Sequence, residues 1–152
     1  MKNILIVLIT CVVVFSCRQE PSKEELLAGK EYKYWIDASE NVEGPRKIAY
    51  FDRKHIRLGY YYYDKKKHFF MEKLQDALYN PSWKFENDSI INIGGEKCKI
   101  LKLTETEFSF VSDPPYRFNR HYKVAPKEII PKEYQKYQEV PDALKPYINC
   151  YD

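Results

Sequence analysis

The chain has few of the residues that usually mark a chemical site. Of its 152 residues, three are histidines, four are cysteines and five are glycines. His55, His68 and His121 do not stand at metal-ligand spacing, nor at nucleophile–base spacing with a serine, cysteine or carboxylate. The sequence therefore predicts no catalytic residue, no metal site and no cofactor, and indicates a protein that is not an enzyme.

A strong excess of charge of one sign is also missing. The formal net charge is +3 at pH 7, and the clearest run of basic residues is Lys65-Lys66-Lys67. This run lies between Asp64 and His68, a position typical of a solvated hairpin turn, and a binding patch is the alternative interpretation. Nucleic-acid binding requires a clustered basic excess, so nucleic acid is not an expected partner.

The only long apolar run stands at the N-terminus. Lys2 precedes the segment Ile4–Phe15, which is apolar except for Thr10. The segment has the length of a signal-peptide core and is too short to cross about 30 Å of hydrocarbon as a helix. We therefore expect residues 1–16 to be a signal peptide that is removed from the mature chain.

The end of this segment points to a lipid anchor. Val14-Phe15-Ser16-Cys17 resembles the lipobox of bacterial lipoproteins, in which a small residue precedes the cut and the cysteine thiol accepts a diacylglyceryl group. The resemblance implies that acyl chains on Cys17 attach the protein to a membrane. The alternative is an ordinary secretory signal with an incidental cysteine.

The charged stretch after the cysteine suggests the location. Lys23-Glu24-Glu25 resembles the export tag that follows the lipidated cysteine in surface lipoproteins of the Bacteroidetes group. We therefore expect a cell-envelope protein, an outer-membrane lipoprotein on the periplasmic face or the cell surface.

Two further cysteines form a candidate disulfide. Lipidation of Cys17 would leave Cys98 and Cys150 as an even pair in an oxidising compartment. A bridge between them would close a loop of about 50 residues and, in the chain-entropy model, stabilise the fold by about 4 kcal/mol. Two unpaired thiols are the alternative.

The remaining chain divides into a tether, a β-rich body and a tail. Residues 17–28 are charged and are expected to form a tether that leads into a helical turn. Residues 29–124 alternate between apolar and polar residues, with turn residues about every eight to twelve positions. This pattern predicts an all-β fold, an antiparallel up-and-down β-barrel of eight to ten strands. Residues 125–152 contain four prolines, and their apolar side chains predict an irregular, partly helical tail packed on the barrel.

Three segments of the body resemble a known family. LLAGKEYKYW at Leu26–Trp35, IAYFDRKHIRLGYYYYD at Ile48–Asp64 and WKFENDSIINIGGEKCKILKLTETEFSF at Trp83–Phe110 are similar to the strands of small lipocalin-like bacterial lipoproteins. Tyr32 departs from the usual tryptophan, and Asp52–His55 lacks the usual turn glycine. The resemblance implies a calycin-type barrel with a ligand-binding role, and leaves the ligand open.

Aromatic residues provide the candidate binding residues. The chain contains 14 tyrosines, 8 phenylalanines and 2 tryptophans. Tyr60, Tyr62 and Trp83 are candidates for contact with a ligand, because their rings offer an apolar face and a polar tip. The alternative is that these rings fill the barrel, and bulky rings inside it argue against a large lipid ligand. Ser89, in Asp88-Ser89-Ile90, matches a short acceptor pattern for protein O-glycosylation.

Together these features predict a lipid-anchored envelope protein whose barrel binds a small ligand or a partner without catalysis. The alternative is a structural or accessory subunit of an outer-membrane assembly, with a filled barrel. An interior cavity of about 300 Å³ or more would favour the first hypothesis, because ligand pockets begin near that size.

Overall fold

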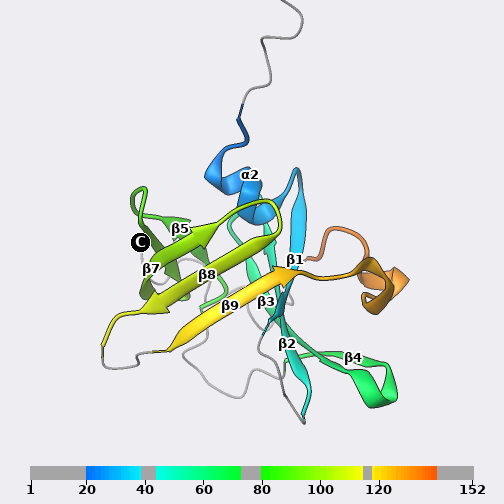
Figure 1. Cartoon of the computed structure of the whole chain (residues 1–152). Coiled ribbons are helices and arrows are strands. Elements are labelled where there is room, and N and C mark those ends of the chain that lie inside the picture. The colour runs from blue at the N-terminus through cyan, green and yellow to red at the C-terminus, as the bar shows by residue number, and fades with distance from the viewer. Residues whose placement is uncertain (1–19, 39–43, 73–79, 115–117, 140–152) are drawn as a thin grey trace, which may run out of the picture.

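The computed structural model describes residues 20–38, 44–72, 80–114 and 118–139. Cys17 and Cys150 lie outside these ranges. The described chain forms one α-helix, nine strands and three short 3-10 helices (Figure 1). In chain order these are α2 (Lys23–Ala28), β1 (Tyr32–Asp37), β2 (Arg46–Asp52), β3 (Arg57–Tyr63), η1 (Asp64–Lys66), β4 (His68–Met71), β5 (Trp83–Phe85), β6 (Ile90–Ile93), β7 (Glu96–Leu103), β8 (Glu107–Ser112), β9 (Asn119–Val124), η2 (Lys127–Ile129) and η3 (Lys132–Tyr134).

All nine strands belong to one curled, antiparallel sheet. Their order is β4-β3-β2-β1-β9-β8-β7-β6-β5, which is two meanders joined where β9 pairs with β1. Ile56, just before β3, bridges to Ser82, just before β5, and the Trp83 N–H donates to the His55 carbonyl at 2.9 Å. The two meanders therefore also meet on the side of the curl opposite the β1–β9 pair, where the chain before β3 contacts the chain at the start of β5. The predicted all-β, barrel-like architecture of eight to ten antiparallel strands is confirmed.

The helix α2 covers one end of the curled sheet (Figure 1). Ser22 begins the helix by accepting the Glu25 N–H at 3.1 Å, and Gly29 ends it at a φ of 66°, where a side chain would be strained. Leu27 and Ala28 are fully buried, and the Leu27 carbonyl accepts the Trp35 indole N–H at 2.7 Å. The last residues of the segment predicted as a tether, Leu27 and Ala28, therefore belong to the core.

The apolar side chains form two clusters on opposite faces of the sheet. The inner cluster lies inside the curl and includes Trp35, Phe51 and Phe108. The outer cluster lies on the convex face of β1–β3 and includes Tyr50, Leu58 and Tyr60. Alternation along each strand produces this division, because successive side chains point to opposite faces.

The first part of the predicted tail covers the outer cluster. Ala125 and Ile130 are buried there, and the Ala125 N–H donates to the Tyr34 carbonyl at 2.9 Å. The Tyr34 hydroxyl donates to the Tyr134 carbonyl at 3.0 Å. Over residues 125–139, the tail therefore packs on the sheet through 3-10 turns, as predicted. Residues 140–152 lie outside the described residues.

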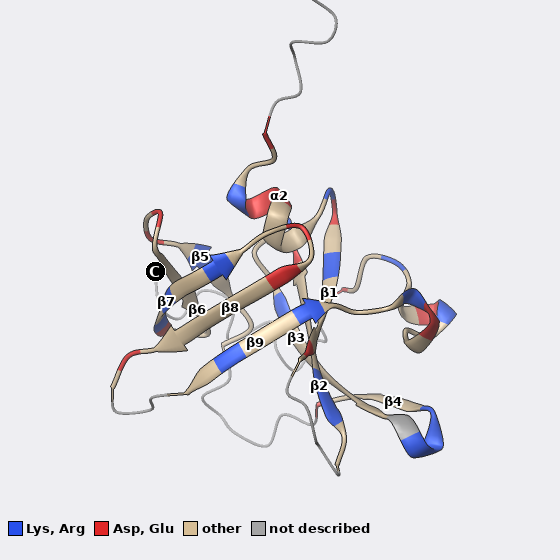
Figure 2. Cartoon of the chain, in the orientation of Figure 1, with Lys and Arg blue, Asp and Glu red and all other residues tan. Residues whose placement is uncertain are grey.

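Charged residues of both signs are mixed over the described elements (Figure 2). The three lysines at residues 65–67 are exposed in the turn between β3 and β4. This placement confirms the prediction of a solvated hairpin turn.

Candidate functional site

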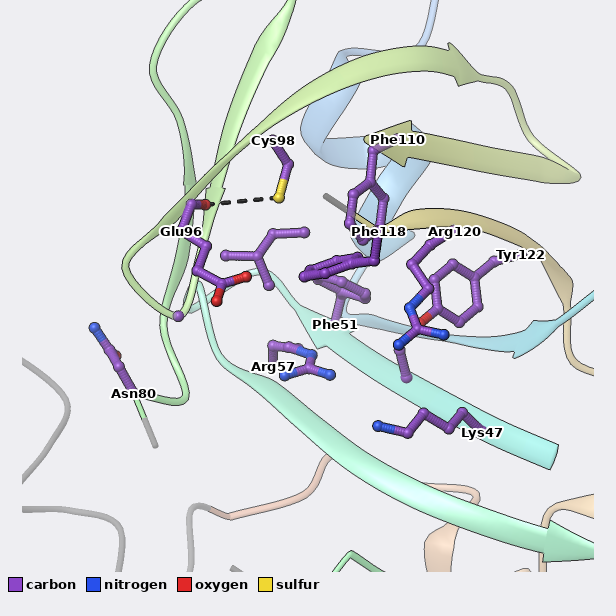
Figure 3. Close-up of a pocket in the computed structure, with 13 residues that line it drawn as sticks. Lys47, Phe51, Arg57, Asn80, Glu96, Cys98, Phe110, Phe118, Arg120 and Tyr122 are labelled. Carbon is purple, nitrogen blue, oxygen red and sulfur yellow. Dashed lines mark hydrogen bonds between the residues drawn. The ribbon is translucent and has the colours of Figure 1, made fainter. Parts of the chain in front are cut away.

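A cavity of about 300 Å³ opens inside the curled sheet (Figure 3). Its wall is built from inward-facing positions of β2, β3, β8 and β9 and from the β6–β7 hairpin. The cavity therefore lies where the two meanders face each other, and its lining combines an aromatic floor with charged side chains.

The floor of the cavity is aromatic. Phe51 comes from β2, Phe110 from β8 and Tyr122 from β9, and Phe118 lies just before β9. The Phe110 ring centroid is 6.2 Å from those of both Phe118 and Tyr122. Such rings offer a flat apolar surface to a bound molecule.

Three cationic side chains line the same cavity. Lys47, Arg57 and Arg120 come from β2, β3 and β9, and Figure 3 shows their charged ends directed into a common space. Each of them stands two residues from an apolar or small residue on the inward face of its strand. Residues two apart on a strand share a face, so the charged side chains lie at the cavity wall rather than on the outside. The Arg120 guanidinium lies 5.2 Å from the centre of the Phe118 ring, within cation–π distance.

A carboxylate near the wall already matches one of these charges. Glu72 accepts the Tyr61 hydroxyl at 2.8 Å and forms an ion pair with Lys47 at 3.2 Å. Burial would raise the pKa of Glu72, but the Tyr61 hydrogen bond and the charges of Lys47 and Arg57 outweigh it, so the pKa is lowered. Gly59 makes room for this carboxylate, because a Cβ there would clash with it. Glu72 is therefore held as an anion beside Lys47.

Two further acids, Asp37 and Glu96, lie near the cavity. Asp37 lies 3.9 Å from Arg120, beyond hydrogen-bond distance. Glu96 lines the cavity from the β6–β7 side, together with Asn80 (Figure 3). The charges of Arg57 and Arg120 also act on the buried Tyr122: burial raises the pKa of Tyr122 and the two charges oppose the rise.

Cys98 lies in the cavity wall as a protonated thiol. Its side chain is buried, and its Sγ lies 3.7 Å from the Glu96 carbonyl oxygen. Burial, together with the charges of Glu96 and Asp113, raises the pKa of Cys98 to about 12. A thiol of this kind is a poor nucleophile at neutral pH. Cys98 is not in a disulfide within the described chain, and the predicted partner, Cys150, lies outside it.

The aromatic residues that the sequence singled out do not line this cavity. Tyr60 and Tyr62 belong to the outer cluster, and the Tyr60 ring lies 5.5 Å from that of Tyr134 in the tail. Trp83 is buried in the inner cluster, 5.8 Å from Phe51, without reaching the cavity wall. A role in ligand contact for these three residues stays a prediction, and the open space lies elsewhere.

The sequence reasoning missed Arg57 and Arg120. The available signal was their position, because each carries a charge on a strand whose next residue on the same face is glycine or aromatic. Arg57 shares a face with Gly59, and Arg120 shares a face with Tyr122 and Phe118. A charge on the inward face of a strand is the pattern to look for in such a barrel.

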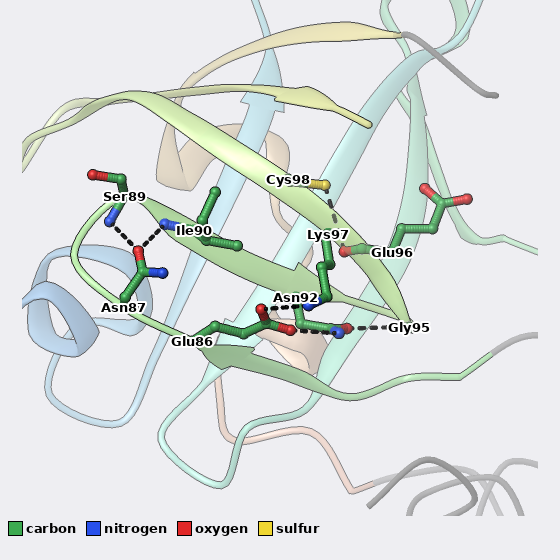
Figure 4. Close-up of polar contacts among 9 residues, drawn as sticks. All are labelled: Glu86, Asn87, Ser89, Ile90, Asn92, Gly95, Glu96, Lys97 and Cys98. Atoms are coloured by element: carbon green, nitrogen blue, oxygen red, sulfur yellow. Dashed lines mark hydrogen bonds and ion pairs between the residues drawn. The ribbon is translucent and has the colours of Figure 1, made fainter. Parts of the chain in front are cut away.

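Ser89, the candidate glycosylation residue, is exposed in the turn between β5 and β6 (Figure 4). Asn87 shapes this turn by accepting the Ser89 N–H at 2.8 Å and the Ile90 N–H at 3.0 Å. Beside it, Glu86 pairs with Lys97 at 3.0 Å and binds Asn92 at 3.4 Å. The Ser89 hydroxyl is therefore accessible, and its modification stays a prediction.

The histidines lie apart from the cavity. His55 packs on Trp83 with ring centroids 4.9 Å apart, and His68 stacks on Phe70 at 5.2 Å. His121 is exposed on β9. Over the described ranges, no three or more histidine, cysteine or acidic residues are grouped so that they could hold a metal ion. No helix in those ranges is long and apolar enough to span a membrane.

Comparisons of the chain with protein-family models, with curated proteins and with solved structures find no match. The cavity and its charges are therefore the basis on which a function can be argued.

Proposed function

We propose that the protein is a lipid-anchored, lipocalin-like protein of the cell envelope that binds one small ligand inside the curled sheet and catalyses no reaction on it. The observation that carries this proposal is the cavity of about 300 Å³ in the sheet interior. Ligand pockets of proteins begin at about this volume, and they combine apolar walls with a few polar groups. A filled barrel, as expected of a purely structural subunit, would leave no such space.

The chemistry of the wall supports binding rather than catalysis. Burial raises the pKa of Cys98 to about 12, so the one thiol at the wall is protonated at neutral pH. No histidine lines the cavity. The carboxylate of Glu72 is engaged by Lys47 and Tyr61, which suits a role in holding the wall together.

Native mass spectrometry of the purified protein tests the proposal. We expect a bound small molecule, retained through gentle purification and lost on unfolding. Ala49→Leu should abolish this binding, because Ala49 lines the cavity from β2 and the larger side chain would fill part of it. The control is Leu101→Phe, which adds bulk on the exposed outer face of β7, where Leu101 is 54% exposed.

A protein that carries no ligand, and whose behaviour Ala49→Leu leaves unchanged, would favour the alternative of an accessory subunit. The anchor is tested separately: Cys17→Ala should abolish labelling of the protein with palmitate, and labelling at the wild-type level would rule out the proposed attachment.

A further inference from the structure

The two arginines at the cavity wall narrow down the kind of ligand. We propose that the cavity binds a small organic anion whose oxyanion head is held by Arg57 and Arg120 and whose flat apolar body lies on the phenylalanine floor. This inference rests on the proposed function, because it names the ligand class of the same cavity.

The first step is the distribution of charge around the cavity. Lys47 already has a carboxylate partner in Glu72 at 3.2 Å, so its charge is locally matched. Arg120 has Asp37 at 3.9 Å, a separation at which an oxyanion in the cavity could still add a direct hydrogen bond. Among the residues that line the cavity, Lys47, Arg57 and Arg120 are cationic and Glu96 is the acid, so the lining carries more positive than negative side chains and favours an anion.

The second step is the position of Arg57 in the middle of the wall. Its positive charge acts to lower the pKa of Glu72, of Cys98 and of Tyr122, and these three residues come from different parts of the fold. A guanidinium in this position can reach a ligand from one side while Arg120 approaches from β9 (Figure 3). Arginine offers a rigid fork of donors that matches the two oxygens of a carboxylate or the oxygens of a phosphate.

The third step is the floor beneath these charges. Phe51, Phe110 and Phe118 line the cavity, and the Arg120 guanidinium packs over the Phe118 ring at 5.2 Å. This contact holds a positive charge at the edge of an apolar surface. A ligand with a charged head and a flat body of one or two rings satisfies both parts of the wall at once. The volume of about 300 Å³ excludes a long acyl chain.

Three related probes test the inference on the wild-type chain, with calorimetry as the measurement: 2-naphthoate, 2-naphthyl phosphate and the neutral 2-naphthamide. We expect at least one of the two anions to bind at least about tenfold more tightly than the amide, because a charge-assisted contact contributes about 1.5–3 kcal/mol. A preference between the two anions distinguishes a carboxylate from a phosphate as the natural head group.

Charge-removing variants locate the binding residues. Arg57→Gln and Arg120→Gln should each weaken binding of the preferred anion by about ten- to a hundredfold and leave binding of the amide nearly unchanged. The matched control is Arg53→Gln, which removes the same charge from the exposed turn between β2 and β3 and should bind all probes like wild type. Circular dichroism and thermal unfolding check that each variant is folded, and the comparison of probes on wild type needs no variant.

The outcomes separate this inference from the proposed function. If the amide binds as tightly as the anions, or if both arginine variants bind the anions like wild type, the anion assignment is wrong while the cavity remains a binding site. If no probe binds at millimolar concentration and the purified protein carries no ligand, the proposed function fails and the ligand class fails with it.

Discussion

Strands β1–β3 and strands β7–β8 belong to one sheet but differ in how many of their faces are buried. Five consecutive residues of β2, from Ile48 to Asp52, are buried, because α2 and the inner cluster cover one face and the tail covers the other. In β8, buried residues alternate with partly exposed ones. In β7 most residues are exposed or half-buried, and Leu101 is 54% exposed.

The sheet therefore has a two-sided part, strands β1–β3, whose two faces are both buried, and a single-sided part, strands β7–β8, which is buried on one face only. The two-sided part owes its second buried face to residues 125–139, which are far from it in sequence. The cavity lies on the inner face, between these two parts, so its wall draws on both. Stability should therefore depend on the outer face of β3 far more than on the outer face of β7.

The sharpest test of this difference is one substitution made on the outer face of each part. Leu58 on β3 is 1% exposed under the tail, whereas Leu101 on β7 is 54% exposed. Leu58→Ala should lower the free energy of unfolding by about 3 kcal/mol, because it removes buried methyl groups and leaves a cavity. Leu101→Ala should change it by less than about 0.5 kcal/mol. Urea unfolding followed by circular dichroism measures both values. Equal effects at the two sites would mean that the tail does not bury the β3 face in solution.

The same difference explains which features the sequence could predict. Turn residues and alternation predicted the strands; one such pair of turn residues, Gly94-Gly95, stands in the β6–β7 hairpin, and both glycines have positive φ. The faces of β8 could be assigned as well, because Phe108 and Phe110 mark the buried face and Glu107 and Ser109 mark the half-exposed one.

The faces of β1–β3 could not be assigned from sequence. Tyr60, Tyr62 and their outward neighbours are as apolar as a barrel interior, since the tail buries them. Arg57 stands on the inward face, where charge is rare, because the cavity admits it there. Two of the three candidate ligand contacts, Tyr60 and Tyr62, fell on the tail-covered face for this reason. A tail distant in sequence leaves no local signal in the strand it covers.

A second prediction concerns Asp52, a fully buried carboxyl at the end of β2. Its Oδ1 accepts the N–H groups of Lys54 and Ile56, both at 2.9 Å, and so shapes the turn into β3. Asp52→Ala should cost about 2 kcal/mol, because two N–H groups lose their acceptor. Asp52→Asn keeps an acceptor oxygen in the same place and should cost less. Thermal unfolding of both variants checks the order, and an equal loss in the two would show that the Oδ1 contacts do not matter.

The stability difference between wild type and Asp52→Asn should also depend on pH, and the sign of this dependence can be predicted. Burial raises the pKa of Asp52 above its ordinary value, although hydrogen bonds from the backbone oppose the rise. The folded chain therefore holds this proton more tightly than the unfolded chain. The resulting stability is fully present below the unfolded pKa and is lost as pH rises through the folded pKa. The advantage of wild type over Asp52→Asn should thus be largest in acid and shrink on the way to neutral pH, and an advantage that grows with pH would contradict the assignment.

The smallest expected effect comes from one hydroxyl between the sheet and the tail. The Tyr50 hydroxyl on β2 accepts the Gln138 N–H at 3.0 Å, a contact that joins the two-sided part of the sheet to the end of the described tail. Tyr50→Phe keeps the buried ring and removes only this acceptor, so it should lower the free energy of unfolding by about 1 kcal/mol. Hydrogen exchange of the Gln138 amide should accelerate as well, because the group loses its partner. Tyr63→Phe is the matched control, since the Tyr63 hydroxyl makes no hydrogen bond within the described part of the chain, and it should leave both measurements unchanged. If Gln138 exchanges at the same rate in wild type and in Tyr50→Phe, the Tyr50 hydroxyl does not protect the end of the described tail, and the contacts made by Ala125, Ile130 and Tyr134 hold the tail on the sheet.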